Sequence, residues 1–182
     1  MEDRKLRWGI LSTANIGRKA LIPAIQAATN SSLEAVASRD EARARAFAEE
    51  EGIPRALNSY QALLEDDGID AIYNPLPNSL HREWTIRAAE AGKHILCEKP
   101  LGLNAVECRE MASAAEANGV KLLEAFMYRF HPRTEKVLEM VHSGVIGELK
   151  QIRSSFTFLL DRPRDIRWNA ELGGGALMDV GC

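Results

Sequence analysis

The sequence is poor in cysteine and contains no C-x-x-C pair. Its 182 residues include three cysteines, Cys97, Cys108 and Cys182, which is an odd number. This pattern argues against a disulfide framework or a zinc site. It predicts reduced thiols and no bound metal.

Long hydrophobic and basic runs are also missing. The residues after Lys5 do not form the apolar core of a signal peptide, and no segment is long enough to span a bilayer. A formal net charge of −3, without a lysine or arginine run, argues against a nucleic-acid surface. We therefore expect a cytoplasmic protein without membrane or nucleic-acid partners. Its hydrophobic content of 46% is enough for an ordinary globular core.

Short apolar runs alternate with helix-like stretches through the first two thirds of the chain. Asp40, Asn58 or Ser59, and Asn104 are suited to begin helices, and Gly52 is suited to end one. The repeated strand–helix–strand order predicts an α/β fold, with a doubly wound parallel sheet of the Rossmann type. Strands are expected at residues 6–11, 33–38, 55–57, 71–73, 94–97 and 120–126.

The pattern changes after about residue 130. Residues 149–160 alternate apolar and polar side chains, which is typical of a strand with one face on a core. We expect residues 1–125 to form the doubly wound domain and residues 126–182 to begin an α+β domain. The second range is too short to complete a large sheet, so a truncated form of a longer protein is expected.

The first strand leads into a turn of small residues. In the dinucleotide fingerprint G-x-G-x-x-G, the three small positions correspond to Ser12, Ala14 and Gly17. Such a turn brings backbone amides at a helix N-terminus close to a pyrophosphate, although serine and alanine lack glycine's freedom at positive φ. Because it follows the first strand, we interpret it as a nucleotide-binding turn rather than an ordinary connection. The candidates are Ser12, Thr13, Ala14, Asn15, Ile16 and Gly17.

The end of the second strand indicates which nucleotide would bind. Ser38 and Arg39 stand where a residue that recognises the adenosine ribose is expected. Both can donate to a 2′-phosphate, which favours NADP and leaves NAD as the alternative. A solvated surface charge is the other interpretation of Arg39, and Asp40 is expected as a helix N-cap.

Three further stretches are expected at strand ends around a nicotinamide. In and after the proline-rich loop Asn74–Asn78, the cofactor candidates are Pro75, Asn78 and His81, with a structural role at a helix start as the alternative for His81. Glu98-Lys99-Pro100 holds a lysine that could touch a substrate hydroxyl and lower its pKa, although the tripeptide is common in loops. Gly173–Asp179 combines glycines with an aspartate that could simply stabilise a helix N-terminus.

Four motifs, in this order, resemble the Gfo/Idh/MocA oxidoreductase family. They are the Ser12–Gly17 turn, Glu98-Lys99-Pro100, Glu124–Pro132 and Gly173–Gly181. The resemblance covers nearly the whole chain, and it is strongest to the NAD(P)-dependent D-xylose and dimeric dihydrodiol dehydrogenase branch. It implies a Rossmann domain followed by an α+β domain whose open sheet often serves oligomer contacts. A homo-oligomer is therefore expected for the full-length form.

The resemblance also implies hydride transfer between NADP and a sugar or cyclic diol. Lys99 and Asp179 would be catalytic, with Asp179 also holding substrate as part of the family's D-x-G-x-H stretch. That stretch would end at position 183, where a tyrosine acid/base is common. The cofactor would contact Glu98 and Lys99. The implied substrate-binding residues are Arg129, Phe130, His131 and Asp179. Arg167 and Trp168 are further candidates from their position alone, in a loop that either covers the substrate or faces solvent.

Two alternative functions remain at this point. One is an NAD-dependent inositol or amino-sugar dehydrogenase of the same family, against which Ser38 and Arg39 argue. The other is a protein that binds NAD(P) without turnover. The absence of position 183 and the expected incomplete second sheet favour this alternative for the chain as given.

Overall fold

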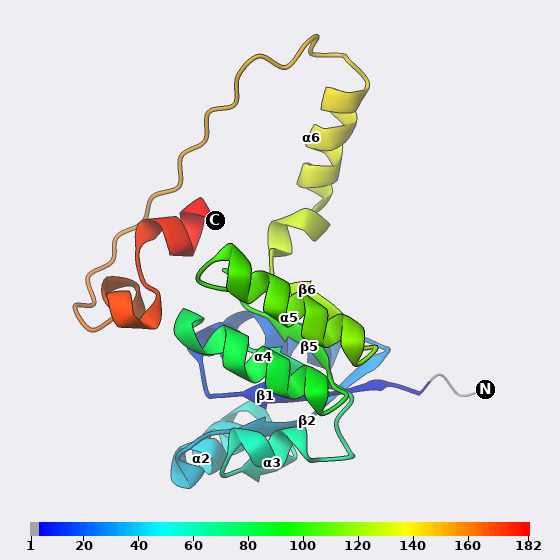
Figure 1. Cartoon of the computed structure of the whole chain (residues 1–182), viewed down its shortest axis with the longest axis vertical. Coiled ribbons are helices and arrows are strands. Elements are labelled where there is room, and N and C mark those ends of the chain that lie inside the picture. The colour runs from blue at the N-terminus through cyan, green and yellow to red at the C-terminus, as the bar shows by residue number, and fades with distance from the viewer. Residues whose placement is uncertain (1–3) are drawn as a thin grey trace.

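A six-stranded parallel sheet forms the centre of the molecule (Figure 1). The computed structural model describes residues 4–182. The strand order is β3-β2-β1-β4-β5-β6, which is the Rossmann order. The predicted fold class is therefore confirmed. The strands are β1 (Leu6–Leu11), β2 (Ser31–Ala37), β3 (Arg55–Leu57), β4 (Ala71–Asn74), β5 (His94–Cys97) and β6 (Leu122–Glu124).

Several of the helices begin where a polar side chain accepts a hydrogen bond from a free amide. Asp40 accepts from the Arg43 amide at 3.0 Å, and Ser59 accepts from the Ala62 amide at 3.1 Å, as expected of N-caps. Gly52 ends its helix at a φ of +66°, a conformation that glycine adopts readily. The helices are α1 (Ile22–Ala27), α2 (Glu41–Glu51), α3 (Tyr60–Leu64), α4 (His81–Glu90), α5 (Ala105–Ala117) and α6 (Pro132–His142).

The helices cover both faces of the sheet, and each face has its own core. On one face, α3, α4 and α5 contribute buried side chains such as Leu63, Ala88 and Met111. On the other face, α1 and α2 contribute Ile25 and Phe47. Because both faces are covered, residues of either alternation can be buried, and all four residues of β4 are. This explains the nearly continuous apolar character of the strands.

Asp70 joins the beginning of β4 to the beginning of β1. Its carboxylate accepts from the backbone amide of Arg7 at 3.0 Å, from the Arg7 side chain at 2.9 and 2.7 Å, and from Arg4 at 2.8 Å. The hydrogen bonds from Arg7 lower the pKa of Asp70 well below its ordinary value. This cluster lies at the amino ends of the strands, opposite the edge where a nucleotide would bind.

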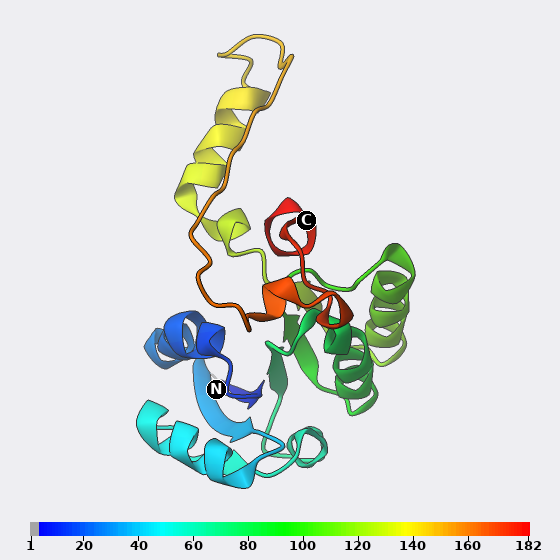
Figure 2. The same ribbon diagram turned by 90° about the vertical axis from the view of Figure 1, so that its left-hand side faces the viewer.

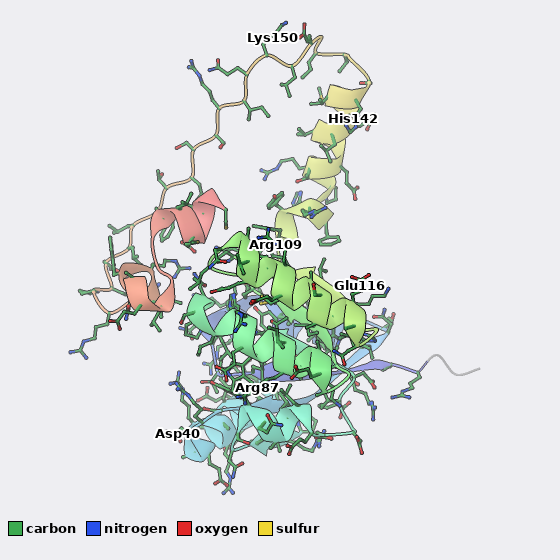
Figure 3. All side chains as sticks on the ribbon, viewed as in Figure 1. Asp40, Arg87, Arg109, Glu116, His142 and Lys150 are labelled. Carbon is green, nitrogen blue, oxygen red and sulfur yellow. The ribbon has the colours of Figure 1, made fainter. Side chains whose placement is uncertain are left out.

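One sequence-based expectation about the second part of the chain was wrong. Residues 149–160 form no strand; they run as an extended segment that leads away from the outer bend near Lys150 and back toward the sheet (Figures 1 and 3). Ile152 and Phe156 are more than 70% exposed. A strand needs a hydrogen-bonded neighbour, and no other strand of residues 4–182 lies next to this segment.

The last part of the chain returns to the carboxyl ends of the strands (Figure 2). Two short 3₁₀ turns, Ile166–Trp168 and Ala170–Leu172, precede a π-helical turn at Leu177–Gly181. We call residues 165–181 the returning segment. The Asn78 side chain donates to the carbonyl of Gly173 at 2.8 Å, which fixes this segment above the loop after β4.

Candidate active site

The nucleotide-binding turn follows β1 at the point where the strand order reverses. A helical stretch starts at Asn15 and continues as a π-helical turn at Gly17–Leu21. The first amides of a helix have no intrahelical partner and therefore suit an anion. Ser12 adopts a φ of +75°, a region that favours glycine, and its buried Oγ has no hydrogen-bond partner.

A hollow of about 630 Å³ extends from this turn to the end of β2. Ser38 is buried, and its Oγ accepts from the Asp40 amide at 3.2 Å, so its own proton is free to be donated. The exposed side chains of Arg39 and Arg43 line the same hollow. Its other lining residues are Ser12, Thr13, Ala14, Asp40, Tyr60, Pro75, Leu76, Pro77, Leu80 and Ile166.

A second, smaller cavity of about 140 Å³ is lined by the charged side chains that could take part in a reaction. It shares Pro75, Leu76 and Ile166 with the first hollow, so the two hollows adjoin along the strand ends, and we call them together the nucleotide groove. The cavity is also lined by Ile16, Asn78, Glu98, Lys99, Arg167, Leu172, Gly174, Gly175 and Asp179.

Lys99 and Asp179 form an ion pair in this cavity. The Nζ of Lys99 lies 2.9 Å from Oδ1 of Asp179 and also donates to the backbone carbonyl of Asp179. The other carboxylate oxygen, Oδ2, accepts from Nε of Arg167 at 2.7 Å. Arg167 is fixed in turn by Asp165, which lies 3.1 Å from its Nη1. Four charged side chains thus form one chain of contacts.

These contacts determine the charge state of Asp179. Burial would raise its pKa, but the hydrogen bonds from Arg167 and Lys99 outweigh burial, and its pKa is lowered. The hydrogen bond to Asp179 also raises the pKa of Arg167. Asp179 is therefore a carboxylate at neutral pH and a weak proton acceptor.

The glycines of the returning segment allow it to fold closely upon itself. A Cβ at Gly174 would lie 2.6, 2.7 and 2.8 Å from the carbonyl oxygens of Ile166, Arg167 and Asn169. Real Cβ contacts are essentially never so short, so only glycine fits at this position. The close fold brings Arg167 and Asp179 to the same cavity although they are 12 residues apart.

His81 occupies a different place from the other cofactor candidates. Its side chain is fully buried, and its ring nitrogens lie 2.8 Å from the carbonyls of Pro100 and Leu76. Burial lowers its pKa. No ring nitrogen is left for a cofactor, so we do not propose direct contact for His81. Instead, it joins the two loops that carry Pro75 and Lys99.

The substrate candidates fall into two groups. Arg167 lines the Lys99 cavity, and Trp168 lines an adjoining hollow of about 330 Å³ that also includes Phe156, Phe158 and Asp179. Arg129, Phe130 and His131 are exposed and do not line the Lys99 cavity. His131 is the N-cap of α6, where it accepts from the Arg133 amide at 3.1 Å.

Sequence reasoning missed Arg43 and Asp165. Arg43 lies three residues after the N-cap Asp40, within the first turn of α2, and this position could have indicated that it shares the hollow with Arg39. Nothing in the sequence signals the contact of Asp165 with Arg167, because it depends on a turn beginning at Asp165.

The residues of the groove fit a dinucleotide. The unpartnered Oγ of Ser12 and the free amides at the helix start suit a pyrophosphate. Arg39, Arg43 and Ser38 suit a phosphorylated adenosine ribose on one side. The other nucleotide would then extend over Pro75 toward Glu98 and Lys99.

The sheet order, the turn and the lysine–carboxylate cavity are together typical of dinucleotide-dependent oxidoreductases. A family model described as "Oxidoreductase family, NAD-binding Rossmann fold" matches residues 6–126, and a "GFO/IDH/MocA C-terminal domain" model matches residues 134–182. The chain belongs to the Gfo/Idh/MocA oxidoreductase family, which confirms the membership expected from its four motifs.

Several curated relatives are similar over almost the whole chain. "D-xylose 1-dehydrogenase (NADP(+)) 2" of Haloferax volcanii is 52% identical over 97% of this chain and 54% of the relative. "Trans-1,2-dihydrobenzene-1,2-diol dehydrogenase" of Xenopus laevis is 39% identical over 97% of this chain and 53% of the relative. The chain spans about half the length of these curated relatives.

A solved structure shares the fold. A 3-ketoreductase from Actinomadura kijaniata, in complex with NADP and TDP-benzene, is 40% identical with a TM-score of 0.92. The match covers 98% of this chain and 55% of that structure's chain. Within residues 4–182, no helix is both long and apolar enough to cross a membrane.

Proposed function

We propose that this chain provides the cofactor-binding part of an enzyme that transfers hydride between NADP and a CH–OH group of a sugar or cyclic diol. The observation that carries the proposal is the Lys99–Asp179 pair, which lies in a cavity that adjoins the hollow between the nucleotide-binding turn and the end of β2. The NADP named for the xylose dehydrogenase and bound in the 3-ketoreductase supports the choice of cofactor. The named dehydrogenases support a sugar or diol as substrate.

Lys99 is the group suited to bind the substrate oxygen. Its ammonium has three N–H donors, of which two point to Asp179, so one remains for a substrate hydroxyl or carbonyl. A positive charge beside this oxygen lowers the pKa of an alcohol and stabilises the negative charge that develops as its proton leaves. When bound, the nicotinamide of NADP supplies the acceptor or donor of the hydride.

Asp179 orients Lys99 rather than removing a proton. Its lowered pKa makes it a weak base, and both its oxygens are held, one by Lys99 and the other by Arg167. Arg167 thus keeps the carboxylate ionised and fixes the direction of the Lys99 ammonium. The aromatic side chains of the adjoining hollow, including Trp168, provide a surface for the rest of the substrate.

Cofactor preference tests the proposal first. We expect calorimetric titration to show that NADP binds at least tenfold more tightly than NAD, because a hydrogen bond to a charged group contributes about 1.5–3 kcal/mol. Arg39→Ala should weaken NADP binding by about tenfold or more, with little effect on NAD. Arg45→Ala is the matched control, because Arg45 is an exposed arginine of α2 that pairs with Glu41.

The outcomes separate the alternatives. Tighter binding of NAD would indicate the NAD-dependent relatives instead. A folded chain that binds neither nucleotide would refute the proposal. Formation of reduced nucleotide from an aldopentose or a cyclic trans-diol, measured on an extended protein that contains this chain, then tests the reaction itself. Cofactor binding without any turnover by that extended protein would favour a non-catalytic role.

A further inference from the structure

Glu98 lies between two hollows of opposite character. It lines the cavity of Lys99, and it also lines a hollow of about 380 Å³. The second hollow is mostly apolar, with Leu21, Leu96 and Met127 in its wall. A glutamate has three side-chain torsions, so its carboxylate needs a partner to stay at one place. The orientation of this carboxylate therefore determines whether the nucleotide groove presents a hydrogen-bond acceptor at this position.

Tyr73 is that partner. It lies in β4, is only 1% exposed, and its hydroxyl donates to Oε1 of Glu98 at 2.6 Å. Burial raises the pKa of Tyr73 above its ordinary value, and the negative charge of Glu98 adds to the effect. The hydroxyl therefore stays protonated, and able to donate, at neutral pH. The ring also lies close to Gly17, where an added Cβ would be 3.6 Å from Cε1 of Tyr73.

The Glu98 carboxylate can still accept hydrogen bonds from a ligand. Oε2 of Glu98 accepts from the Lys99 amide at 3.3 Å, and each carboxylate oxygen can accept more than one hydrogen bond. In the proposed mode of binding, the adenosine half of NADP lies over Ser38 and Arg39. The nicotinamide half, whose ribose hydroxyls and carboxamide are donors, then lies at the Lys99 cavity.

We infer that Tyr73 is a positioning residue that holds the Glu98 carboxylate at the groove as an acceptor for the nicotinamide nucleotide of NADP. The inference rests on the proposed function. Without the Tyr73 hydroxyl, Glu98 is free to turn away toward the apolar hollow or to take several orientations. The adenosine side of the groove, at Arg39, would be unaffected.

The test compares two ligands on the whole chain. Calorimetry is performed with NADP and with adenosine 2′,5′-bisphosphate, which lacks the nicotinamide nucleotide. For Tyr73→Phe we expect about a tenfold weaker affinity for NADP and an unchanged affinity for the bisphosphate, because only one charged hydrogen bond is lost. Tyr128→Phe, which removes an exposed hydroxyl, should change neither.

A double-mutant cycle shows whether Tyr73 acts through Glu98. Glu98→Ala should also weaken NADP binding selectively, and adding Tyr73→Phe to it should cause little further loss. Equal losses for both ligands, no loss, or additive losses in the double variant would overturn the inference. Thermal melts of each variant identify a folding defect, which would affect both ligands. If the unaltered chain binds the bisphosphate but not NADP, the inference fails; if it binds neither, the proposed function fails and the inference with it.

Discussion

Ser12 offers a sharp test of how the nucleotide-binding turn is built. Its φ of +75° is unfavourable for a residue with a Cβ, and its Oγ is buried without a partner. Ser12→Gly removes both penalties, of about 1–2 kcal/mol for the left-handed conformation and about 1–3 kcal/mol for the unsatisfied hydroxyl. Glycine costs about 0.5–1 kcal/mol in unfolded-state entropy.

The balance favours the variant even with the smaller value of each penalty. We expect Ser12→Gly to stabilise the chain by about 1–2 kcal/mol, which raises Tm by about 2–8 °C in a protein of this size. The assay is thermal unfolding without nucleotide, confirmed by urea denaturation. Ser12→Ala keeps the strained backbone and removes only the hydroxyl, so its gain should be smaller.

Ser32→Gly is the matched control. Ser32 lies within β2 and pairs with Arg7, so glycine there brings its entropic cost without relieving strain. This variant should be destabilised by about 0.5–1 kcal/mol. If Ser12→Gly lowers Tm as Ser32→Gly does, the reasoning about the turn is refuted.

Two further predictions concern ion pairs. Asp179→Asn should speed amide hydrogen exchange in the returning segment by about 10- to 100-fold, equivalent to about 1.4–2.8 kcal/mol, because Lys99 loses its charged partner. The sheet should be unaffected, exposed Asp161→Asn is the control, and unchanged exchange would contradict this account. Asp70→Asn should cost about 1–3 kcal/mol at pH 7 by urea denaturation, with exposed Asp67→Asn as the control. Since the folded-state pKa of Asp70 is lowered, the stabilisation is fully present above its unfolded pKa of about 3.9 and is lost progressively as pH falls from there through the lower folded-state pKa. A stability gap between Asp70→Asn and the unaltered chain that does not narrow as pH falls below about 3.9 would argue against this linkage.

The sheet could be predicted from the sequence because its signals are local. Apolar runs, caps such as Asp40 and the small residues of the turn each depend on a few neighbouring positions. Residues 149–160 show where this fails: their alternation indicates a strand, but a strand forms only beside a partner. The pattern gives the period of the side chains and not the presence of that partner.

The candidate site was predicted from the sequence in two ways. The nucleotide-binding turn and Arg39 were predicted to contact the cofactor from their positions after strands. A catalytic role for Lys99 and Asp179 was predicted mainly from the family resemblance. Their ion pair, and the contact of Tyr73 with Glu98, could not be predicted. Each contact joins residues distant in sequence, and burial and orientation decide which of several charged or polar partners meet.

The returning segment has a thermodynamic consequence for the groove. Lys99 and Asp179 are 80 positions apart, and Asn78 and Gly173 are 95 apart. The entropic cost of closing a flexible loop rises only logarithmically, by about 0.6 kcal/mol per doubling of its length. Closing these long loops therefore costs only slightly more than closing a crossover of about twenty residues. Once one of these two contacts has formed, forming the other costs little additional loop-closure entropy. A few hydrogen bonds are therefore enough to hold the returning segment over the strand ends.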